Sequence, residues 1–348
     1  MAGDPLLEVR HLRVSFRTED GIVQAVDDVS LSLWPGETLG IVGESGSGKS
    51  VTMMTVMRLI TDPNAQFAGQ VLYRGRDLMR LSQAQIRQVR GAGIAMIFQD
   101  PMTSLNPVYR VGWQIAEQIR AHEPMSGKAA RARAAELLSA VGIPHAAQRV
   151  DDYPHQFSGG MRQRVMIAMA LSCNPDILIA DEPTTALDVT IQAQILSLIA
   201  RLKDEFGAAV VLITHDMGVV AETADRVAVM YAGRIVEQGT RRDVFYNAQH
   251  PYTWGLLGSI ARLDRPKPRR LATIPGQPPS LLRLPPGCAF GDRCRHRFDR
   301  CADRPELAYR SGNEHMDACH LDPEQKRKYR QTTVHPELDQ AADAGEAW

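Results

Sequence analysis

The chain begins with a region in which apolar and polar residues alternate. The alternation runs from about residue 6 to 45, for example through Leu7, Val9 and Leu12. Successive side chains of a strand point to opposite faces, so this pattern predicts half-buried antiparallel strands. From about residue 100 to 160 the apolar residues recur with a helical period instead. We therefore expect an antiparallel β subdomain and, after it, a helical subdomain.

Short runs of apolar residues return after the helical region. Residues 177–180 and 210–213 are two such runs, and each ends in polar residues. Runs of this length suit buried parallel strands, which present functional side chains at their C-terminal ends. Residues 227–239 predict a hairpin that turns at Ala232-Gly233. The expected fold class is therefore α/β, with a parallel sheet at its core.

The composition changes beyond about residue 260. Residues 262–270 are basic and contain proline, which predicts a linker, and four of the five cysteines follow it. The residues after about 325 are polar. We expect three parts, namely a large domain over 1–260, a small cysteine-containing extension over 261–325 and a disordered tail over 326–348.

Charge and hydropathy restrict the function. Lys and Arg together number 40, as do Asp and Glu, so the formal net charge is zero. This balance gives no electrostatic footprint for nucleic acid, and we expect no nucleic-acid partner. No apolar run approaches the ~18–20 residues of a membrane-spanning helix, and the start, MAGDPLLEVR, lacks the pattern of a signal peptide. We expect a cytoplasmic chain that meets the membrane through partners.

The strongest local motif is GESGSGKS at residues 43–50, which matches the phosphate-binding loop pattern G-x-x-x-x-G-K-[ST]. It follows an apolar strand and precedes a helix, as the pattern requires. Glycines let backbone N–H groups close around phosphates, Lys49 would reach the β- and γ-phosphates, and Ser50 would bind Mg²⁺. The loop residues expected to bind ATP are Gly43, Glu44, Ser45, Gly46, Ser47, Gly48, Lys49 and Ser50.

A second polar site closes the apolar run 177–180. Asp181 stands at the tip of this predicted strand, where a carboxylate can hold Mg²⁺. The next residue, Glu182, would face the γ-phosphate and polarise the attacking water. An Asp-Glu-Pro sequence by itself is more often an ordinary solvated strand end. The loop at 43–50 is what favours the catalytic interpretation.

A third motif, FSGGMRQ at residues 157–163, resembles the signature of the ABC ATPases, with Phe in the place of the usual Leu. Gln99, residues 186–188 and His215 also stand in order where that family has its Q-loop, D-loop and H-loop. The resemblance covers about residues 6–260. It implies an ABC ATPase domain with the three subdomains described above.

The resemblance implies a head-to-tail dimer of such domains. Each ATP would lie between the 43–50 loop of one subunit and Ser158, Gly159 and Gly160 of the other. Asp188 would lie at the dimer interface, although a helix cap is its alternative role. Phe16 would stack on adenine, although a core aromatic residue in a strand is the alternative there.

The resemblance also assigns the chemistry. Gln99 would sense the γ-phosphate and relay its presence to the membrane partner, and it would join Ser50 and Asp181 around Mg²⁺. His215 would contact the γ-phosphate and hold the catalytic geometry. The expected catalytic residues are therefore Glu182, His215 and Gln99.

Further segments resemble one group within the family. Residues 99–107, HPYT at 250–253, and the tail from 274 to 319 look like parts of the oligopeptide and dipeptide importer ATPases. This implies a peripheral subunit at the cytoplasmic face of the bacterial cell membrane that energises peptide uptake. Its partners would be a paralogous second ATPase, two permeases and, indirectly, an extracytoplasmic binding protein. Importers of nickel, glutathione or other small solutes share these segments, and a soluble ABC ATPase without a transport role is the alternative from another class.

Four cysteines lie in the extension, at Cys288, Cys294, Cys301 and Cys319. A small region with little core favours a stabilising metal, and four thiolates suit Zn²⁺ or a [4Fe–4S] cluster equally. Cysteines without a metal are the third interpretation. The family resemblance favours the cluster, in a structural role. Because the 43–50 loop belongs to the other domain, we expect MgATP binding to be independent of the extension.

Overall fold

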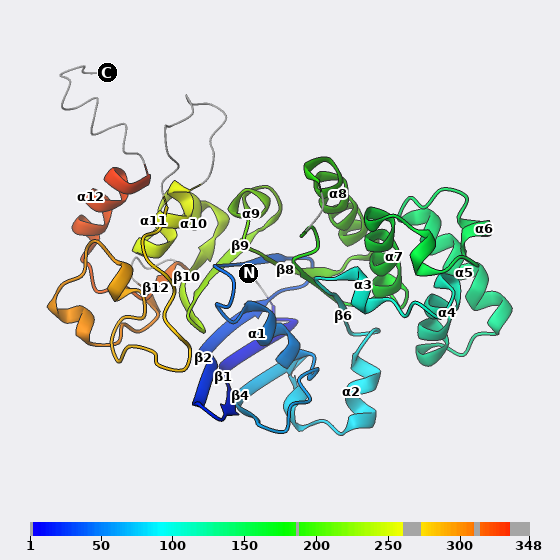
Figure 1. Ribbon diagram of the computed structural model, residues 1–348, viewed down its shortest axis with the longest axis horizontal. Helices are drawn as coiled ribbons and strands as arrows, with labels where there is room; N and C mark the ends of the chain where they lie inside the picture. The colour runs from blue at the N-terminus through cyan, green and yellow to red at the C-terminus, as the bar shows by residue number, and fades with distance from the viewer. Residues whose placement is uncertain (1–2, 186–187, 260–272, 310–313, 335–348) are drawn as a thin grey trace, which may run out of the picture.

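The computed structural model describes residues 3–185, 188–259, 273–309 and 314–334, and these residues form two sheets with flanking helices (Figure 1). The smaller sheet is antiparallel, with the strand order β2-β1-β4-β5. Its strands are β1 (Leu7–Thr18), β2 (Gly21–Leu33), β4 (Ala65–Tyr73) and β5 (Arg76–Asp77). Leu7, Leu12 and Val14 of β1 are buried, in agreement with the alternating pattern.

The larger sheet has the strand order β11-β12-β10-β9-β3-β8-β7-β6. Strands β6, β7, β8, β3 and β9 run parallel, and β10, β12 and β11 continue the sheet in antiparallel pairs. The bounds are β3 (Thr38–Val42), β6 (Ile94–Ile97), β7 (Ile177–Asp181), β8 (Ala209–Thr214), β9 (Arg226–Tyr231), β10 (Arg234–Thr240), β11 (Ala308–Tyr309) and β12 (Met316–Asp317). Every residue of β3, β7 and β8 is buried, which explains why these strands show no alternation.

Helices α4 to α7 gather at one end of the molecule (Figure 1). Their apolar faces share a core that includes Ile115, Leu138 and Met166. The side chain of Ser126 caps the start of α5 by accepting the N–H of Ala129. The helices of this region are α3 (Pro101–Ser104), α4 (Val111–His122), α5 (Gly127–Ala140), α6 (Ala146–Arg149) and α7 (Gly159–Leu171). They agree with the helical pattern at 100–160.

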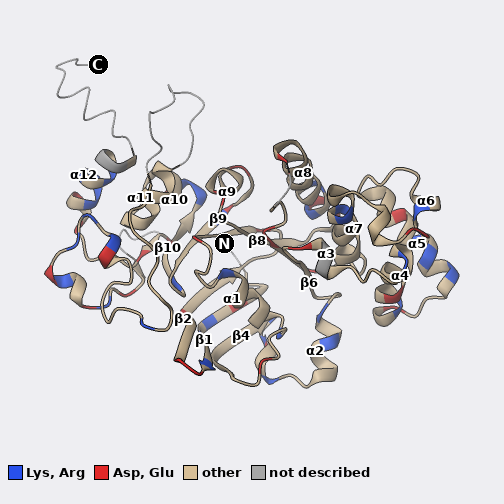
Figure 2. Cartoon of the chain, in the orientation of Figure 1, with Lys and Arg blue, Asp and Glu red and all other residues tan. Residues whose placement is uncertain are grey.

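The other helices flank the two sheets. They are α1 (Lys49–Val56), α2 (Gln83–Val89), α8 (Val189–Phe206), α9 (Met217–Thr223), α10 (Arg241–Tyr246), α11 (Pro251–Gly258) and α12 (Pro323–Val334). Among the described helices, none has both the length and the apolar character to cross a membrane. Lys and Arg are interspersed with Asp and Glu along the whole chain (Figure 2), in keeping with its balanced charge.

The hairpin expected at 227–239 is formed by β9 and β10. Its turn residues, Ala232 and Gly233, have φ angles of 47° and 80°. Two positive φ angles in a two-residue loop match the right-handed twist of the flanking strands. The hairpin predicted from the Ala232-Gly233 dipeptide is therefore confirmed.

The extension joins the edge of the larger sheet. Glu237 and Gln238 of β10 pair with Asp317 and Met316 of β12, and β11 pairs with β12 in turn. The extension is therefore continuous with the core sheet, although a separate small unit was expected. The predicted linker at 262–270 lies outside the described residues.

The disordered tail expected from residue 326 differs from the structure at its start. Helix α12 spans Pro323–Val334, and the ammonium group of Lys326 is buried against the Asp317 carboxylate at 2.6 Å. The polar composition of this segment hid the helix. Besides the buried ion pair, Tyr329 packs against the hydrophobic core and stacks on His296, with ring centroids 4.1 Å apart. Residues 335–348 lie outside the described part of the chain.

Candidate nucleotide-binding site

The 43–50 loop connects β3 to α1. Gly48 has a φ of 100°, and a Cβ atom there would lie 2.4 Å from the carbonyl oxygen of Ala25. A Cβ atom on Gly43 would lie 2.1 Å from the carbonyl oxygen of Met230. Glycine is therefore required at both positions, because neighbouring backbone approaches the loop closely.

Lys49 begins α1 and points back over the loop. Its Nζ donates to the carbonyl oxygens of Gly43 and Glu44 at 2.8 and 2.9 Å, and the residue is only 4% exposed. Burial lowers the pKa of Lys49, while the carboxylates of Glu182, Asp181 and Glu44 oppose that shift. The loop thus encloses one cation close to the start of a helix, where the helix dipole also favours anions.

Ser50 and Asp181 meet across 131 positions of sequence. The Ser50 hydroxyl donates to Oδ1 of Asp181 at 2.9 Å. Asp181 ends β7 and is 5% exposed. Burial raises the pKa of its carboxyl group, and the hydrogen bond from Ser50 offsets only part of that increase. A hydroxyl and a carboxylate oxygen side by side are the type of ligand that Mg²⁺ prefers. The two residues expected to bind Mg²⁺ from these motifs are therefore brought together.

Three side chains contact the Glu182 carboxylate, two of them from other segments of the chain. Its Oε2 accepts from Nε2 of Gln99 and from the hydroxyl of Thr185, each at 2.9 Å, and its Oε1 lies 3.4 Å from Nδ1 of His215. The parallel strands β6, β7 and β8 end at the same edge of the sheet, which brings Gln99, Glu182 and His215 together. Thr185 was not singled out from the sequence.

The backbone at Glu182 adopts a conformation that side chains rarely take. Its φ is 44°, in the left-handed region. Strained backbone of this kind persists when the surrounding contacts hold it, and it concentrates at functional sites. The backbone N–H of Glu182 donates to the carbonyl of Ile213 at 2.9 Å, which helps to fix it.

The signature residues lie away from this cluster. Ser158 and Gly159 are exposed and Gly160 is half-buried, at the start of α7. Figure 1 shows α7 well separated from α1. The chain's own Ser158, Gly159 and Gly160 therefore do not line its own 43–50 loop.

Two of the weaker candidates occupy positions consistent with both interpretations. Asp188 caps α8, because its Oδ1 accepts the N–H of Ile191 at 2.9 Å. Ala186 and Leu187 lie outside the described residues. Phe16 is half-buried and packs against the core of the antiparallel sheet.

The four cysteines of the extension surround one small cavity. Cys288, Cys294, Cys301 and Cys319 line it together with Phe290, and its volume of ≈10 Å³ has room for about one water molecule. None of them is in a disulfide. Within the described residues, no three His, Cys, Asp or Glu side chains are placed so that they could hold a metal ion.

Three of the thiols around this cavity, those of Cys288, Cys294 and Cys319, favour their neutral form. Burial raises the pKa of Cys288, that of Cys294 to about 11 and that of Cys319 to about 12. Binding of a metal would therefore have to displace protons from these thiols.

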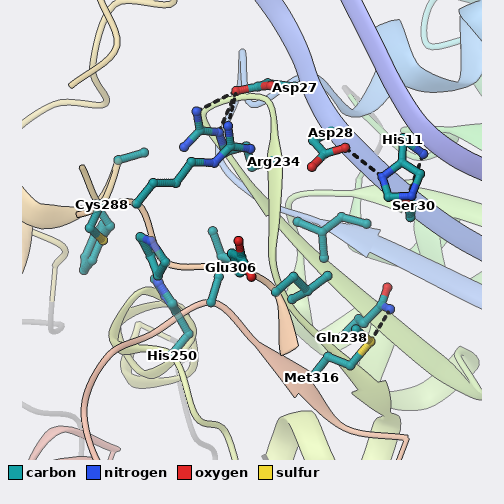
Figure 3. Close-up of a pocket in the computed structure, with 18 residues that line it drawn as sticks. His11, Asp27, Asp28, Ser30, Arg234, Gln238, His250, Cys288, Glu306 and Met316 are labelled. Carbon is teal, nitrogen blue, oxygen red and sulfur yellow. Dashed lines mark hydrogen bonds and ion pairs between the residues drawn. The ribbon is translucent and has the colours of Figure 1, made fainter. Parts of the chain in front are cut away.

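A second cavity lies between β1, β2, β10 and the extension (Figure 3). Its volume is about 570 Å³, and charged residues line it. Nε of Arg234 donates to Asp27 at 2.9 Å, and His11 lies 3.0 Å from Asp28. The side chains of Arg234, Asp27, His11 and Asp28 are thus paired with one another in the lining of the cavity.

Two contacts with the loop were missed in the sequence. The hydroxyl of Tyr252 accepts the N–H of Glu44 at 2.8 Å, and the guanidinium of Arg293 binds the Glu44 carboxylate at 2.6 and 2.9 Å. Tyr252 stands in the first turn of α11, where its N–H donates to the side chain of His250, which caps the helix. The extension and the loop are thus in direct contact, although we expected them to be separate.

Comparison with known proteins agrees with this geometry. A family model described as "ABC transporter" matches residues 26–185. A second model, for the C-terminal region of oligopeptide/dipeptide transporters, matches residues 236–301 and so begins inside β10. A solved dimeric structure of the ATP-binding cassette MJ0796, in a post-hydrolysis state with ADP and Pi, has a TM-score of 0.61 at 28% identity. That alignment covers 68% of this chain and 99% of the other.

Curated relatives are much more similar. The dipeptide transport ATP-binding protein DppD of Bacillus subtilis is 56% identical over 299 residues, which cover 86% of this chain and 89% of the relative. The oligopeptide transport ATP-binding protein OppD of Salmonella typhimurium is 54% identical over 302 residues, with 87% and 90% coverage. The fold and these matches define an ABC transporter ATPase. Within that class, the chain belongs to the oligopeptide/dipeptide family of ATP-binding proteins.

Proposed function

We propose that the 43–50 loop binds the phosphates of MgATP and that Glu182 polarises the water that attacks the γ-phosphate. The observation that carries this proposal is the position of the Glu182 carboxylate between Gln99, Thr185 and His215, next to the Ser50–Asp181 pair. Lys49 would contact the β- and γ-phosphates, and Ser50, Asp181 and Gln99 would hold Mg²⁺. When bound, Mg²⁺ would neutralise part of the charge of the phosphates.

His215 and Gln99 would orient the Glu182 carboxylate. A base must lie within hydrogen-bond reach of the water that it activates, and hydrogen bonds from both sides restrict where its oxygens point. The side chain of His215 is 63% exposed, so it is accessible to a nucleotide phosphate. The test of these roles is hydrolysis by Glu182→Gln, which is described below.

We propose that hydrolysis takes place in a head-to-tail dimer with a paralogous ATPase subunit. Support comes from the start of α7, where Ser158 and Gly159 are exposed and Gly160 is half-buried, and from the distance of α7 from α1 in Figure 1. A helix start that is free of side-chain caps offers its backbone N–H groups to an anion of another subunit. Asp188 would lie at the interface and Phe16 against adenine.

We propose that the chain energises the import of dipeptides or oligopeptides at the cytoplasmic face of the membrane, with two permeases and, indirectly, a solute-binding protein. The matching C-terminal region and the peptide-transport names of the relatives support this substrate class. An exposed apolar surface, formed by Val108, Tyr109 and Trp113, follows Gln99 closely in sequence. The rings of Tyr109 and Trp113 stack with centroids 4.3 Å apart, which gives a rigid apolar contact for a permease.

The transport proposal is tested in the intact complex. Native membranes are solubilised in detergent, the tagged chain is captured, and its partners are identified by mass spectrometry. We expect two permeases and a second ATPase in stoichiometric amounts, and uptake of labelled dipeptide in cells should depend on Lys49. A captured complex without permeases would contradict the transport role. If a Lys49 variant takes up labelled peptide normally but no longer takes up nickel or glutathione, the proposed substrate class is wrong.

We also propose that the four cysteines hold a structural metal cofactor, with a [4Fe–4S] cluster preferred to Zn²⁺. Support comes from the four thiols around one cavity, which are the ligand set of such clusters. The cavity at ≈10 Å³ is too small for a cluster, so the cysteines would have to move outward to admit it. The cofactor would crosslink the extension and would take no part in hydrolysis.

A further inference from the structure

Glu44, the second residue of the 43–50 loop, is held at three points. Its carboxylate accepts two hydrogen bonds from Arg293, its N–H donates to Tyr252, and its carbonyl oxygen accepts from Nζ of Lys49. Tyr252 belongs to α11 and Arg293 to the extension, so two of these three anchors follow β10 in the sequence. The peptide that positions Lys49 is therefore fixed by the C-terminal part of the chain.

The guanidinium of Arg293 is held in one orientation. Its side chain is 6% exposed, its Nε donates to the carbonyl of Pro275 at 2.8 Å, and its Nη1 also reaches the hydroxyl of Tyr231 at 3.3 Å. It lies over the rings of Tyr231 and Phe290 as well. A planar guanidinium with both edges occupied binds a carboxylate in one geometry, which Lys cannot reproduce.

The charge of Glu44 makes this contact important for a phosphate site. A carboxylate at the second position of the loop contributes to the field at Lys49. Left unpaired, it would compete for the Lys49 ammonium and repel incoming phosphates. Arg293 neutralises it and directs it away from Lys49.

The position of Arg293 depends in turn on the cysteine cavity. Arg293 ends a short 3₁₀ turn, Gly291–Arg293, that connects two of the cysteines of the cavity. In this turn the N–H of Cys294 donates to the carbonyl of Gly291, and the N–H of Gly291 donates to the carbonyl of Cys288. A change in the spacing of Cys288 and Cys294 would therefore move Arg293.

We propose that Arg293 is a positioning residue for ATP binding, through which the cysteine-containing extension sets the nucleotide affinity of the 43–50 loop. Arg293 acts through Glu44 and does not itself touch the nucleotide. The inference rests on the proposed role of that loop as the ATP site.

The test compares the affinity of the full chain for a fluorescent ATP analogue with Mg²⁺. Arg293→Gln should weaken binding about tenfold, the scale of one charge-assisted hydrogen-bonded pair. Arg293→Lys should restore only part of the loss, because its ammonium forms a single contact. Arg297→Gln is the matched control, since Arg297 is exposed in the same segment and pairs only with exposed Asp292 among the contacts described. It should bind as the wild type does.

Further variants separate positioning from general destabilisation. Lys326→Met removes a buried ion pair of the extension that does not touch the loop, and it should leave affinity within about twofold of wild type even if thermal stability falls. In a Glu44→Gln background, Arg293→Gln should cost at most about twofold, because the two residues act as one unit. In the assembled complex, Arg293→Gln should raise the KM for ATP and leave kcat within about twofold.

Three results would overturn the inference. These are wild-type affinity in a folded Arg293→Gln protein, equal losses in Arg293→Gln and Lys326→Met, or additive losses with Glu44→Gln. Lys49→Ala separates this inference from the proposed function on which it rests. If Lys49→Ala and Arg293→Gln both bind the ATP analogue as the wild type does, the loop is not the ATP site. If Lys49→Ala loses binding and Arg293→Gln keeps it, only the role of Arg293 is wrong.

Discussion

Nε2 of Gln99 donates to the carboxylate of Glu182 at 2.9 Å, so the second residue after β6 is joined to the first residue after β7. This bond connects two motifs that are 83 positions apart in sequence. It lets a change at Gln99, which precedes the exposed Val108–Trp113 surface, alter the orientation of the candidate base.

Glu182→Gln should retain MgATP binding and slow hydrolysis by at least ~10²-fold, the scale expected when a general base is lost. A glutamine fits the same space, and its carbonyl oxygen can still accept from Gln99 and Thr185. The mutant should accumulate as an ATP-bound dimer, visible by size-exclusion chromatography. Glu205→Gln, on the exposed face of α8, is the control. A wild-type rate for Glu182→Gln in the assembled complex would refute the base assignment.

Lys49→Ala and Ser158→Arg should fail at different steps. Lys49→Ala removes the enclosed cation and should abolish tight MgATP binding to the single chain. Ser158→Arg should leave that binding intact and block dimer formation and hydrolysis, because Ser158 would act on the nucleotide of the other subunit. Ser139→Arg, exposed on α5 of the same helical region, should behave as wild type. Equal loss of single-chain binding in Lys49→Ala and Ser158→Arg would exclude action between subunits.

Protein purified without oxygen should be brown, with absorption near ~400 nm and about four irons per chain, if the four thiols ligate a cluster. Cys294→Ser should remove the colour and loosen residues 285–320, because this small region has little core. Cys173→Ser, outside the cavity, should keep the colour. Colourless protein with stoichiometric zinc would replace the cluster by zinc. Metal-free protein whose four cysteines are all freely alkylated in the intact complex would exclude a metal altogether.

The stability of the extension should depend on pH through His315. Nε2 of His315 lies 2.8 Å from Oε1 of buried Glu237. Burial lowers the pKa of His315, but the hydrogen bond and charge of Glu237, with Asp243 and Asp317, outweigh it, so the pKa is raised. The protonated form therefore stabilises the folded state. This contribution is fully present below the unfolded pKa of about 6.5 and is lost as pH rises through the folded-state value.

Thermal unfolding as a function of pH measures this contribution. The difference in Tm between wild type and His315→Gln should be largest below about pH 6.5 and should shrink as the pH rises. His155→Gln, at an exposed site before the signature motif, should show no such trend. A difference for His315→Gln that is constant over the whole range would show that His315 is not bound as the imidazolium.

The sequence alone determined the elements that meet at the candidate site. The glycines of the 43–50 loop and the apolar runs before Asp181 and His215 are local patterns, and local backbone geometry needs no distant partner to be recognised. The family resemblance placed Gln99 and His215 at this site beside Glu182, and the parallel strands of the structure, which end at one edge of the sheet, explain why the three side chains meet. The dipeptide Ala232-Gly233 likewise predicted the hairpin that β9 and β10 form.

The tertiary structure decided how the extension is used. Arg293 and Glu44 are 249 positions apart, and an arginine in an Arg-rich segment carries no periodic signal that would select it from its neighbours. The pairing of β12 with β10 involves two residues of each strand, too short a stretch to show a pattern. Helix α12 looked disordered because its composition is mostly polar, whereas the contacts that hold it are the buried Lys326–Asp317 ion pair and the packing of Tyr329 on His296. Contacts of this kind depend on which side chains the folded chain brings together in a buried place, and that is not encoded in local spacing.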